Sequence, residues 1–124
     1  MGTQKTLSWL VALVGLWELI AAFVLGYSAT PAALWNAVII GLALIILGIW
    51  AAVSKQEVTD KTLDWINVVL GIWLIIAPFL LGYTAVKAAV WNDVIVGIVV
   101  IVLAGWGVVA ISHQHPNIAA PKAT

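Results

Sequence analysis

The side chain with the clearest chemical potential in this sequence is Glu18, a carboxyl group inside a long apolar run. A carboxyl in such surroundings can hold or pass a proton, bind a cation, or donate a hydrogen bond as a neutral acid. We expect Glu18 to be a neutral, hydrogen-bonding acid at a helix interface, with proton or cation movement and contact to a partner helix as alternatives. Small residues lie around it at helical spacing, on a face that normally packs against other helices: Val14, Gly15, Ala21 and Ala22.

Amide and carboxyl side chains also occur near the ends of the other apolar runs. Asn36, Asn92 and Asp93 lie shortly after a turn, where we expect interface polar residues that bind the nearby turn backbone. The alternative is a small polar site at that face. Asn67 is a further intramembrane polar candidate, and Asp64 is expected to be a first-turn acid or a helix cap.

The sequence lacks the usual patterns of catalysis and metal binding. His113 and His115 are two ligands, whereas a zinc site takes roughly three or four, and the chain has no cysteine. There is no Ser-His-Asp set, no glycine-rich phosphate loop and no basic cluster suited to nucleic acid. We therefore expect no enzyme activity, no metal or other cofactor, and no nucleic-acid partner.

The composition indicates that the protein lies in a membrane. The 124 residues are 65% hydrophobic and 8% charged, whereas soluble domains are about 45–50% apolar and about 25% charged. Spanning helices need about 20 apolar residues, and continuous apolar runs favour helices over barrel strands. The first run is expected to be a retained helix and not a signal peptide, since a similar run recurs inside the chain. Four runs qualify: 7–27, 32–53, 63–83 and 88–111.

The chain repeats itself. Sliding the sequence until Tyr27 lies on Tyr83 aligns residues 5–53 with residues 61–109 without a gap. Two spans per repeat make the repeats parallel, whereas inverted repeats of the transporter kind need an odd number. The sequence therefore predicts an all-α membrane protein in which four transmembrane helices form two parallel-repeat helical hairpins. Its expected parts are a first hairpin (1–53), a polar cytoplasmic linker (54–62), a second hairpin (63–111) and a polar C-terminal tail (112–124).

The ends of the spans carry turn and interface signals. Gly26 and Gly82 suit the left-handed residue that closes a helix, and Thr30-Pro31 suits the start of the next one. A link this short forces antiparallel neighbouring helices. Aromatic residues at the span ends are expected to form interfacial belts: Tyr27, Trp35, Tyr83 and Trp91 on one side, and Trp9, Trp50, Trp65 and Trp106 on the other.

Other residues indicate how helices pack and how the chain is oriented. Trp17 and Trp73 lie deeper than the belts and are expected to fill the bundle or face a partner. Glycines predict close helix packing, either within the chain or between chains as a homo-oligomer or membrane complex: Gly15, Gly41, Gly48, Gly71 and Gly97. Lysine excess marks the cytoplasmic side, so both termini are expected inside a prokaryotic plasma membrane. Lys87 lies opposite the others, which are Lys5, Lys55, Lys61 and Lys122.

Four stretches of the second repeat form a recognisable series: 64–67 (DWIN), 70–74 (LGIWL), 77–83 (APFLLGY) and 91–97 (WNDVIVG). This series resembles the SPW-repeat family of small integral membrane proteins. The family's triplet corresponds to Ala77-Pro78-Phe79, where only the proline is kept, and to Ala21-Ala22-Phe23 in the more diverged first repeat. The resemblance implies a two-hairpin membrane protein and implies no activity.

Together these observations predict a non-catalytic multi-pass membrane protein, a structural or accessory subunit that packs with itself or with a larger membrane complex. The alternative is a small transport or proton-conducting protein that uses Glu18. A monomeric channel needs polar residues along its whole length, and these spans contain too few.

Overall fold

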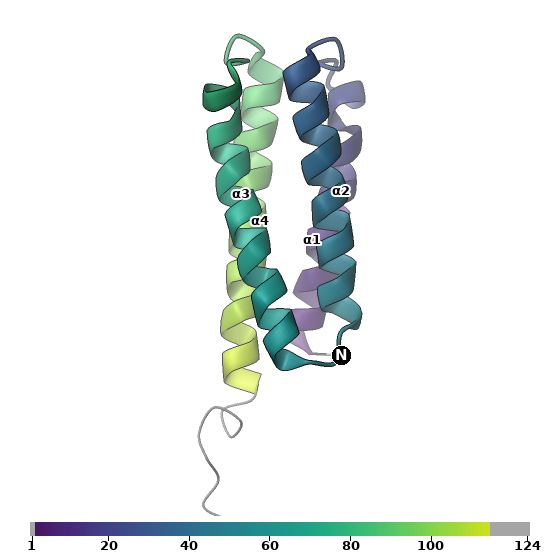
Figure 1. Ribbon diagram of the computed structural model, residues 1–124, viewed down its shortest axis with the longest axis vertical. Helices are drawn as coiled ribbons and strands as arrows, with labels where there is room; N and C mark the ends of the chain where they lie inside the picture. Colours follow the sequence, from purple (N-terminus) through teal and green to yellow (C-terminus); the bar gives the residue numbers. More distant parts are fainter. Residues whose placement is uncertain (1, 115–124) are drawn as a thin grey trace, which may run out of the picture.

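The computed structural model describes residues 2–114, with side chains described as far as Ile111, and these residues form four helices (Figure 1). All four are long and apolar enough to cross a membrane. The prediction of an all-α protein with four membrane-spanning helices is therefore confirmed. The helices are α1 (Thr3–Val24), α2 (Pro31–Val53), α3 (Glu57–Leu81) and α4 (Lys87–Gln114).

The helices form two hairpins that stand side by side. Helix α1 packs on α2 and α3 on α4, while α1 also contacts α4 and α2 contacts α3. Both hairpin turns lie at one end of the bundle, here called the turn end (Figure 1). The start of α1 and the connection between the hairpins lie at the opposite end, here called the terminal end. The helices therefore enclose one common axis.

Glycine closes the first helix of each hairpin. Gly26 and Gly82 have φ values of 83° and 81°, a left-handed conformation that other residues adopt at a cost. Tyr27 N–H then donates to the Ala22 carbonyl at 2.9 Å, and Tyr83 N–H donates to the Pro78 carbonyl at 3.1 Å. These bonds satisfy carbonyls at the helix end and turn each tyrosine back toward the bundle.

The connection between the hairpins is shorter than the sequence suggests. The segment 54–62, expected to be a polar linker, is largely helical because α3 already begins at Glu57. Two acids in its first turn, Glu57 and Asp60, suit the positive end of the helix dipole. Asp64 consequently lies two turns inside α3, and the expectation that it caps the helix or lies in its first turn was wrong.

Glycines bring the two helices of each hairpin into close contact. A Cβ atom on Gly41 of α2 would lie 2.7 Å from the Leu19 nitrogen of α1. A Cβ atom on Gly97 of α4 would lie 2.5 Å from the Gly71 carbonyl oxygen of α3. Gly15 and Gly48 are equally confined between α1 and α2. The small-residue faces therefore serve contacts within the chain.

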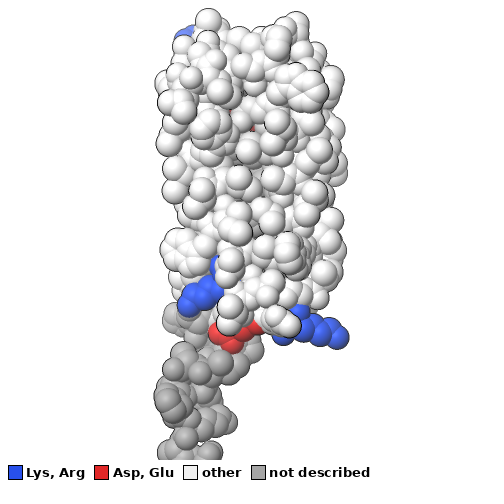
Figure 2. Space-filling view, viewed as in Figure 1, with Lys and Arg blue, Asp and Glu red and all other residues white. Residues whose placement is uncertain are grey.

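The outer surface is apolar between the two ends. Figure 2 shows charged side chains at the terminal end and a small lysine surface at the turn end, with uncharged atoms over nearly all of the face between them. Seven tryptophans are exposed on this surface, as residues that face lipid or its headgroups should be: Trp9, Trp17, Trp35, Trp50, Trp65, Trp91 and Trp106.

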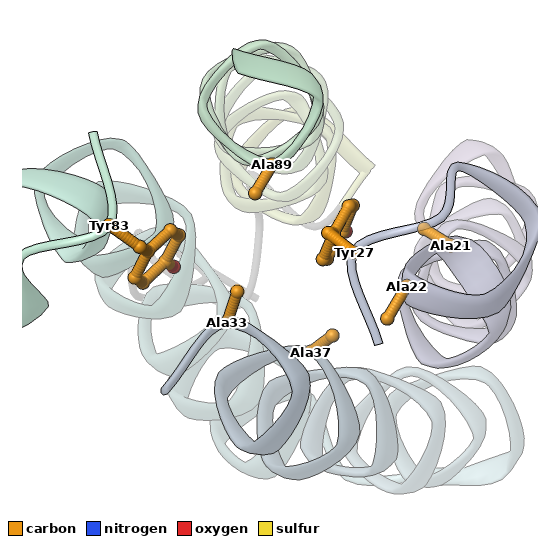
Figure 3. Close-up of a cluster of buried hydrophobic side chains, with 7 residues drawn as sticks. All are labelled: Ala21, Ala22, Tyr27, Ala33, Ala37, Tyr83 and Ala89. Carbon is orange, nitrogen blue, oxygen red and sulfur yellow. The ribbon is translucent and has the colours of Figure 1, made fainter. Parts of the chain in front are cut away.

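The two tyrosines lie inside the bundle and not in the interfacial belt. Tyr27 is 2% exposed and Tyr83 is 3% exposed, so their assignment as interfacial aromatics was wrong. Figure 3 shows both rings among alanine side chains, whose small volume leaves room for them near the turn end. The alanines of this cluster are Ala21, Ala22, Ala33, Ala37 and Ala89.

Candidate functional site

A symmetric set of hydrogen bonds joins the two hairpins near the turn end. Trp17 Nε1 of α1 donates to Asn92 Oδ1 of α4 at 2.8 Å. Trp73 Nε1 of α3 donates to Asn36 Oδ1 of α2, also at 2.8 Å. These are matching residues of the two repeats, so each tryptophan binds the asparagine of the other hairpin. Trp17 and Trp73 thus connect the repeats.

The turn tyrosines bind the same asparagines. Asn92 Nδ2 donates to the Tyr27 hydroxyl at 3.0 Å, and Asn36 Nδ2 donates to the Tyr83 hydroxyl at 3.1 Å. Each tyrosine therefore also reaches across to the other hairpin. We call this set of six residues the Trp–Asn–Tyr frame; it comprises Trp17, Tyr27, Asn36, Trp73, Tyr83 and Asn92.

The asparagines and Asp93 do not play the role that the sequence suggested. They were expected to bind the backbone of the nearby turns, and this expectation was wrong. Asn36, Asn92 and Asp93 are 6%, 7% and 1% exposed, and their hydrogen bonds are to other side chains. The inward tyrosine rings supply these partners, because the alanine-lined space admits them.

Two carboxyl groups break the symmetry of the frame. Glu18 Oε1 accepts a hydrogen bond from Asn92 Nδ2 at 2.9 Å, and Asp93 Oδ2 accepts one from the Tyr83 hydroxyl at 2.6 Å. The two carboxyls lie within hydrogen-bonding range of each other, between α1 and α4. The matching residues of the other repeat are Leu74 and Ala37, so the symmetry-related place between α2 and α3 is apolar.

Each of these acids keeps one oxygen that the rest of the described chain does not bind. Glu18 is fully buried, and its Oε2 is without a donor, as is Asp93 Oδ1. Within the described residues, the lysines of the first three helices and their connections lie at the terminal end, and Lys87 is exposed at the first residue of α4. No cation therefore balances the pair in the part of the chain that the structure describes.

The tyrosines beside the acids are held as neutral phenols. Burial raises the pKa of Tyr27 above its ordinary value, and the charges of Glu18 and Asp93 raise it further. Burial likewise raises the pKa of Tyr83, with its hydrogen bond to Asp93 as the next cause. Both phenols therefore stay protonated across the usual pH range, and the Tyr83 hydroxyl remains able to donate to Asp93.

A second polar cluster lies at the terminal end. Gln4 Nε2 donates to Ser8 Oγ at 2.8 Å and to Asp64 Oδ2 at 3.1 Å, which links α1 to α3. Gly107 of α4 makes room for this carboxyl, because a Cβ atom there would lie 2.5 Å from Asp64 Oδ2. This cluster again joins the two hairpins.

Lys5 closes the bundle at the same end. Its Nζ forms an ion pair with Asp60 Oδ2 at 2.6 Å and donates to the Ala51 carbonyl at 2.7 Å. It also donates to the Ser54 carbonyl. The single ammonium group therefore holds the end of α2 and the start of α3 against α1, and satisfies carbonyls at the C-terminus of α2.

An apolar layer separates the two polar clusters. It consists of fully buried residues, one from each helix: Val11, Leu44, Leu74 and Val100. Asn67 lies one turn beyond Asp64, is also fully buried, and has neither side-chain atom bound within the described chain. The axis of the bundle is thus closed between Asn67 and Glu18.

The sequence singled out both Glu18 and Asp93 but did not place the two carboxyls together. A signal was present, since Glu18 and Asp93 are the acids for which the other repeat has an apolar residue. The residues 115–124, which include His115, lie outside the described part of the chain, and the side chain of His113 is not described either. Among the described residues, no group of His, Cys, Asp and Glu has the arrangement of a metal site.

The fold and this network define a class: a membrane-spanning four-helix bundle made of one hairpin motif used twice. A family model described as the SPW repeat domain matches residues 5–107. The chain therefore belongs to the SPW repeat family, as its sequence motifs suggested. No curated protein and no solved structure matches the chain.

Proposed function

We propose that the protein is a non-catalytic structural or accessory component of a membrane. The observation that carries this proposal is the way its polar groups are used. The Trp–Asn–Tyr frame and the Gln4–Asp64 bond join the hairpins to each other, and the apolar layer with Leu44 and Leu74 closes the axis between them. Such an arrangement stabilises one bundle, and among the described residues the layer across its axis is apolar and fully buried.

We expect any partner to bind at the lipid-facing surface, because the described residues outside the four helices form only short turns and connections. That surface is broad and apolar, with exposed aromatic and branched side chains on all four helices. We propose that it packs against a second copy or against another membrane protein. We further propose that this membrane is a prokaryotic plasma membrane and that both termini lie in the cytoplasm. The orientation is supported by the lysines, since among the described residues only Lys87 lies at the turn end.

Photo-crosslinking in native membranes tests this role. A crosslinking amino acid at Ile46 or at its repeat equivalent Val102, both exposed, should give an adduct with a second copy or a distinct protein. The matched buried positions Leu44 and Val100 are the controls and should give no such adduct. If only lipid adducts form at Ile46, at Val102 and at exposed positions on α1 and α3, the proposal that this surface packs against a protein is wrong.

Thiol labelling tests the orientation separately. Ser28→Cys in the first turn should react with an impermeant reagent added to intact cells, while Ser54→Cys should react only after the membrane is opened. The reverse pattern would invert the orientation and leave the fold unaffected.

A proton-conducting role through Glu18 is the second candidate, favoured by the contact between Glu18 and Asp93. Conduction would require water or a side chain to cross the apolar layer at Leu74 and Val100. Purified protein in liposomes should show no proton flux above that of protein-free liposomes. A flux that disappears in Glu18→Gln would replace the structural role with this one.

A further inference from the structure

We propose that Glu18 and Asp93 form a proton-binding site in which one proton is held between Glu18 Oε2 and Asp93 Oδ1. The site lies inside the bundle near its turn end, between α1 and α4. This chain alone supplies the groups that bind the proton, and no metal ion takes part.

Burial is the first argument. Glu18 is 0% exposed and Asp93 is 1% exposed, and their carboxyls are within hydrogen-bonding range of each other. Two adjacent carboxylates in a medium of low dielectric constant repel each other and lose their hydration. One shared proton removes the repulsion and replaces it with a short, charge-assisted hydrogen bond.

The hydrogen bonds around the pair give the number of protons. Asn92 donates to Glu18 Oε1 and Tyr83 donates to Asp93 Oδ2, which leaves one buried oxygen on each carboxyl without a donor. One proton between these two oxygens satisfies both of them. The two outer donors stabilise the remaining negative charge, so the pair is best matched as one acid and one carboxylate.

The same bonds argue against a metal cation. Calcium and magnesium ions take about six or more oxygen ligands. Here the amide oxygens of Asn36 and Asn92 already accept the tryptophan N–H groups, and the Tyr83 hydroxyl directs its proton to Asp93. Among the described groups around the pair, two carboxylate oxygens are left without a donor, which is enough for a proton and too few for such an ion.

The surroundings indicate the side from which the proton arrives. Asp93 is six residues into α4, roughly 9 Å along the helix from its first residue. The titratable groups that face the pair are the phenols Tyr27 and Tyr83 from the two turns, while α2 and α3 contribute Asn36 and the apolar Leu74. Because the apolar layer closes the other direction, the site should equilibrate with water at the turn end.

Such a site makes the stability of the bundle depend on pH. The folded protein holds the proton between two buried oxygens, whereas in the unfolded state each carboxyl is free to ionise in water. Stability is therefore fully present below about pH 4, where the unfolded carboxyls are protonated as well. It decreases as the pH rises from there to the pH at which the folded protein releases the shared proton. For one proton, the unfolding equilibrium constant should rise about tenfold per pH unit in that range.

Infrared spectroscopy and unfolding titrations on the full chain in lipid nanodiscs test the site. The wild-type protein should show the C=O stretching band of a protonated carboxyl, and this band should be absent from both Glu18→Gln and Asp93→Asn. The tenfold dependence per pH unit should be lost in the same two variants. Asp64→Asn, which changes a carboxyl of the terminal-end cluster, is the matched control and should keep both the band and the pH dependence.

Three results would overturn the proposal. The first is a wild-type protein without the band, which can be measured even if the two variants do not fold. The second is a band that persists in Glu18→Gln or is lost in Asp64→Asn. The third is an unfolding equilibrium that responds to sodium concentration at constant pH, which would assign the two free oxygens to a cation.

Discussion

The two repeats share one frame and differ in what they add to it. Both contribute a tryptophan, a tyrosine and an asparagine, so every bond of the Trp–Asn–Tyr frame occurs twice. The acids occur once: Glu18 and Asp93 lie between α1 and α4, while Leu74 and Ala37 occupy the equivalent place between α2 and α3. The repeated residues hold the bundle together, and the unrepeated ones make one side of it chemically distinct.

The terminal end shows the same division. There the second repeat carries Asp64 and Asn67, where the first repeat has Ser8 and Val11. Substitutions at repeated positions should therefore have matched effects in the two hairpins, whereas substitutions at unrepeated positions should not. The following predictions test this comparison, beginning with the largest effect.

Leucine at the close-contact glycines should have the largest effect and should affect both hairpins equally. Gly41→Leu and Gly97→Leu each push a side chain into the backbone of the neighbouring helix. We expect each to destabilise the protein by about 3 kcal/mol in equilibrium unfolding in mixed micelles. Helix content should remain, since each helix forms its own backbone bonds in lipid. A large loss of stability in only one of the two variants would show that the hairpins are not equivalent.

Removing the frame asparagines should have the next largest effect, and here the repeats should differ. Asn92→Leu leaves Trp17, Tyr27 and Glu18 without their common partner, whereas Asn36→Leu affects Trp73 and Tyr83. We expect the free energy of unfolding to fall by about 3 kcal/mol for Asn92→Leu and by about 2 kcal/mol for Asn36→Leu, because buried polar groups left unpaired are costly. The same unfolding titration measures both, and equal losses would mean that the bond to Glu18 contributes nothing.

Removing the tyrosine hydroxyls should give a smaller and again unequal pair of effects. Tyr83→Phe leaves both Asn36 Nδ2 and Asp93 Oδ2 without a partner, and we expect a loss of about 2 kcal/mol. Tyr27→Phe leaves Asn92 Nδ2 still bound to Glu18, so its loss should be about 1 kcal/mol. The ring is kept in both variants, and a larger loss for Tyr27→Phe would reverse the asymmetry.

The smallest effects are expected at two neighbouring glycines of α4. In Gly107→Ala the added methyl group meets Asp64 Oδ2 at 2.5 Å, so the carboxyl must move, with a loss of about 1 kcal/mol. In Gly105→Ala nothing lies within 4 Å, and the change should be within about 0.5 kcal/mol or slightly stabilising. Equal effects in thermal unfolding would show that the Asp64 cluster adds no stability.

The fold was predictable because the sequence features that determine it are visible without a structure. Four long apolar runs require helices in lipid, and the matched tryptophans, glycines and tyrosines make the repeat visible. The left-handed glycines Gly26 and Gly82 were predicted from their position alone, and the structure confirms them. The early start of α3 was not predicted, since hydropathy does not report an ion pair such as that between Lys5 and Asp60.

The site was less predictable, because it depends on directions that a linear pattern does not contain. Tyr27 and Tyr83 look like interfacial residues in sequence, and only the packing of the alanines shows that their rings turn inward. Asn92 and Glu18 lie on different hairpins, so their bond requires the relative rotation of α1 and α4. Comparing the repeats position by position was the available clue to Asp93.

The reciprocal bonds between the hairpins have a consequence for how such a chain can be built. Trp17 of the first hairpin binds Asn92 of the second, and the equivalent Trp73 of the second binds the equivalent Asn36 of the first. This is the contact pattern of an isologous dimer with a two-fold axis. The connection at residues 54–56 joins two such subunits covalently. Two separate identical hairpins would carry every substitution twice and could not place Glu18 and Asp93 together on one side alone. Covalent joining of the halves is what allows a two-fold frame to hold a one-sided pair of acids.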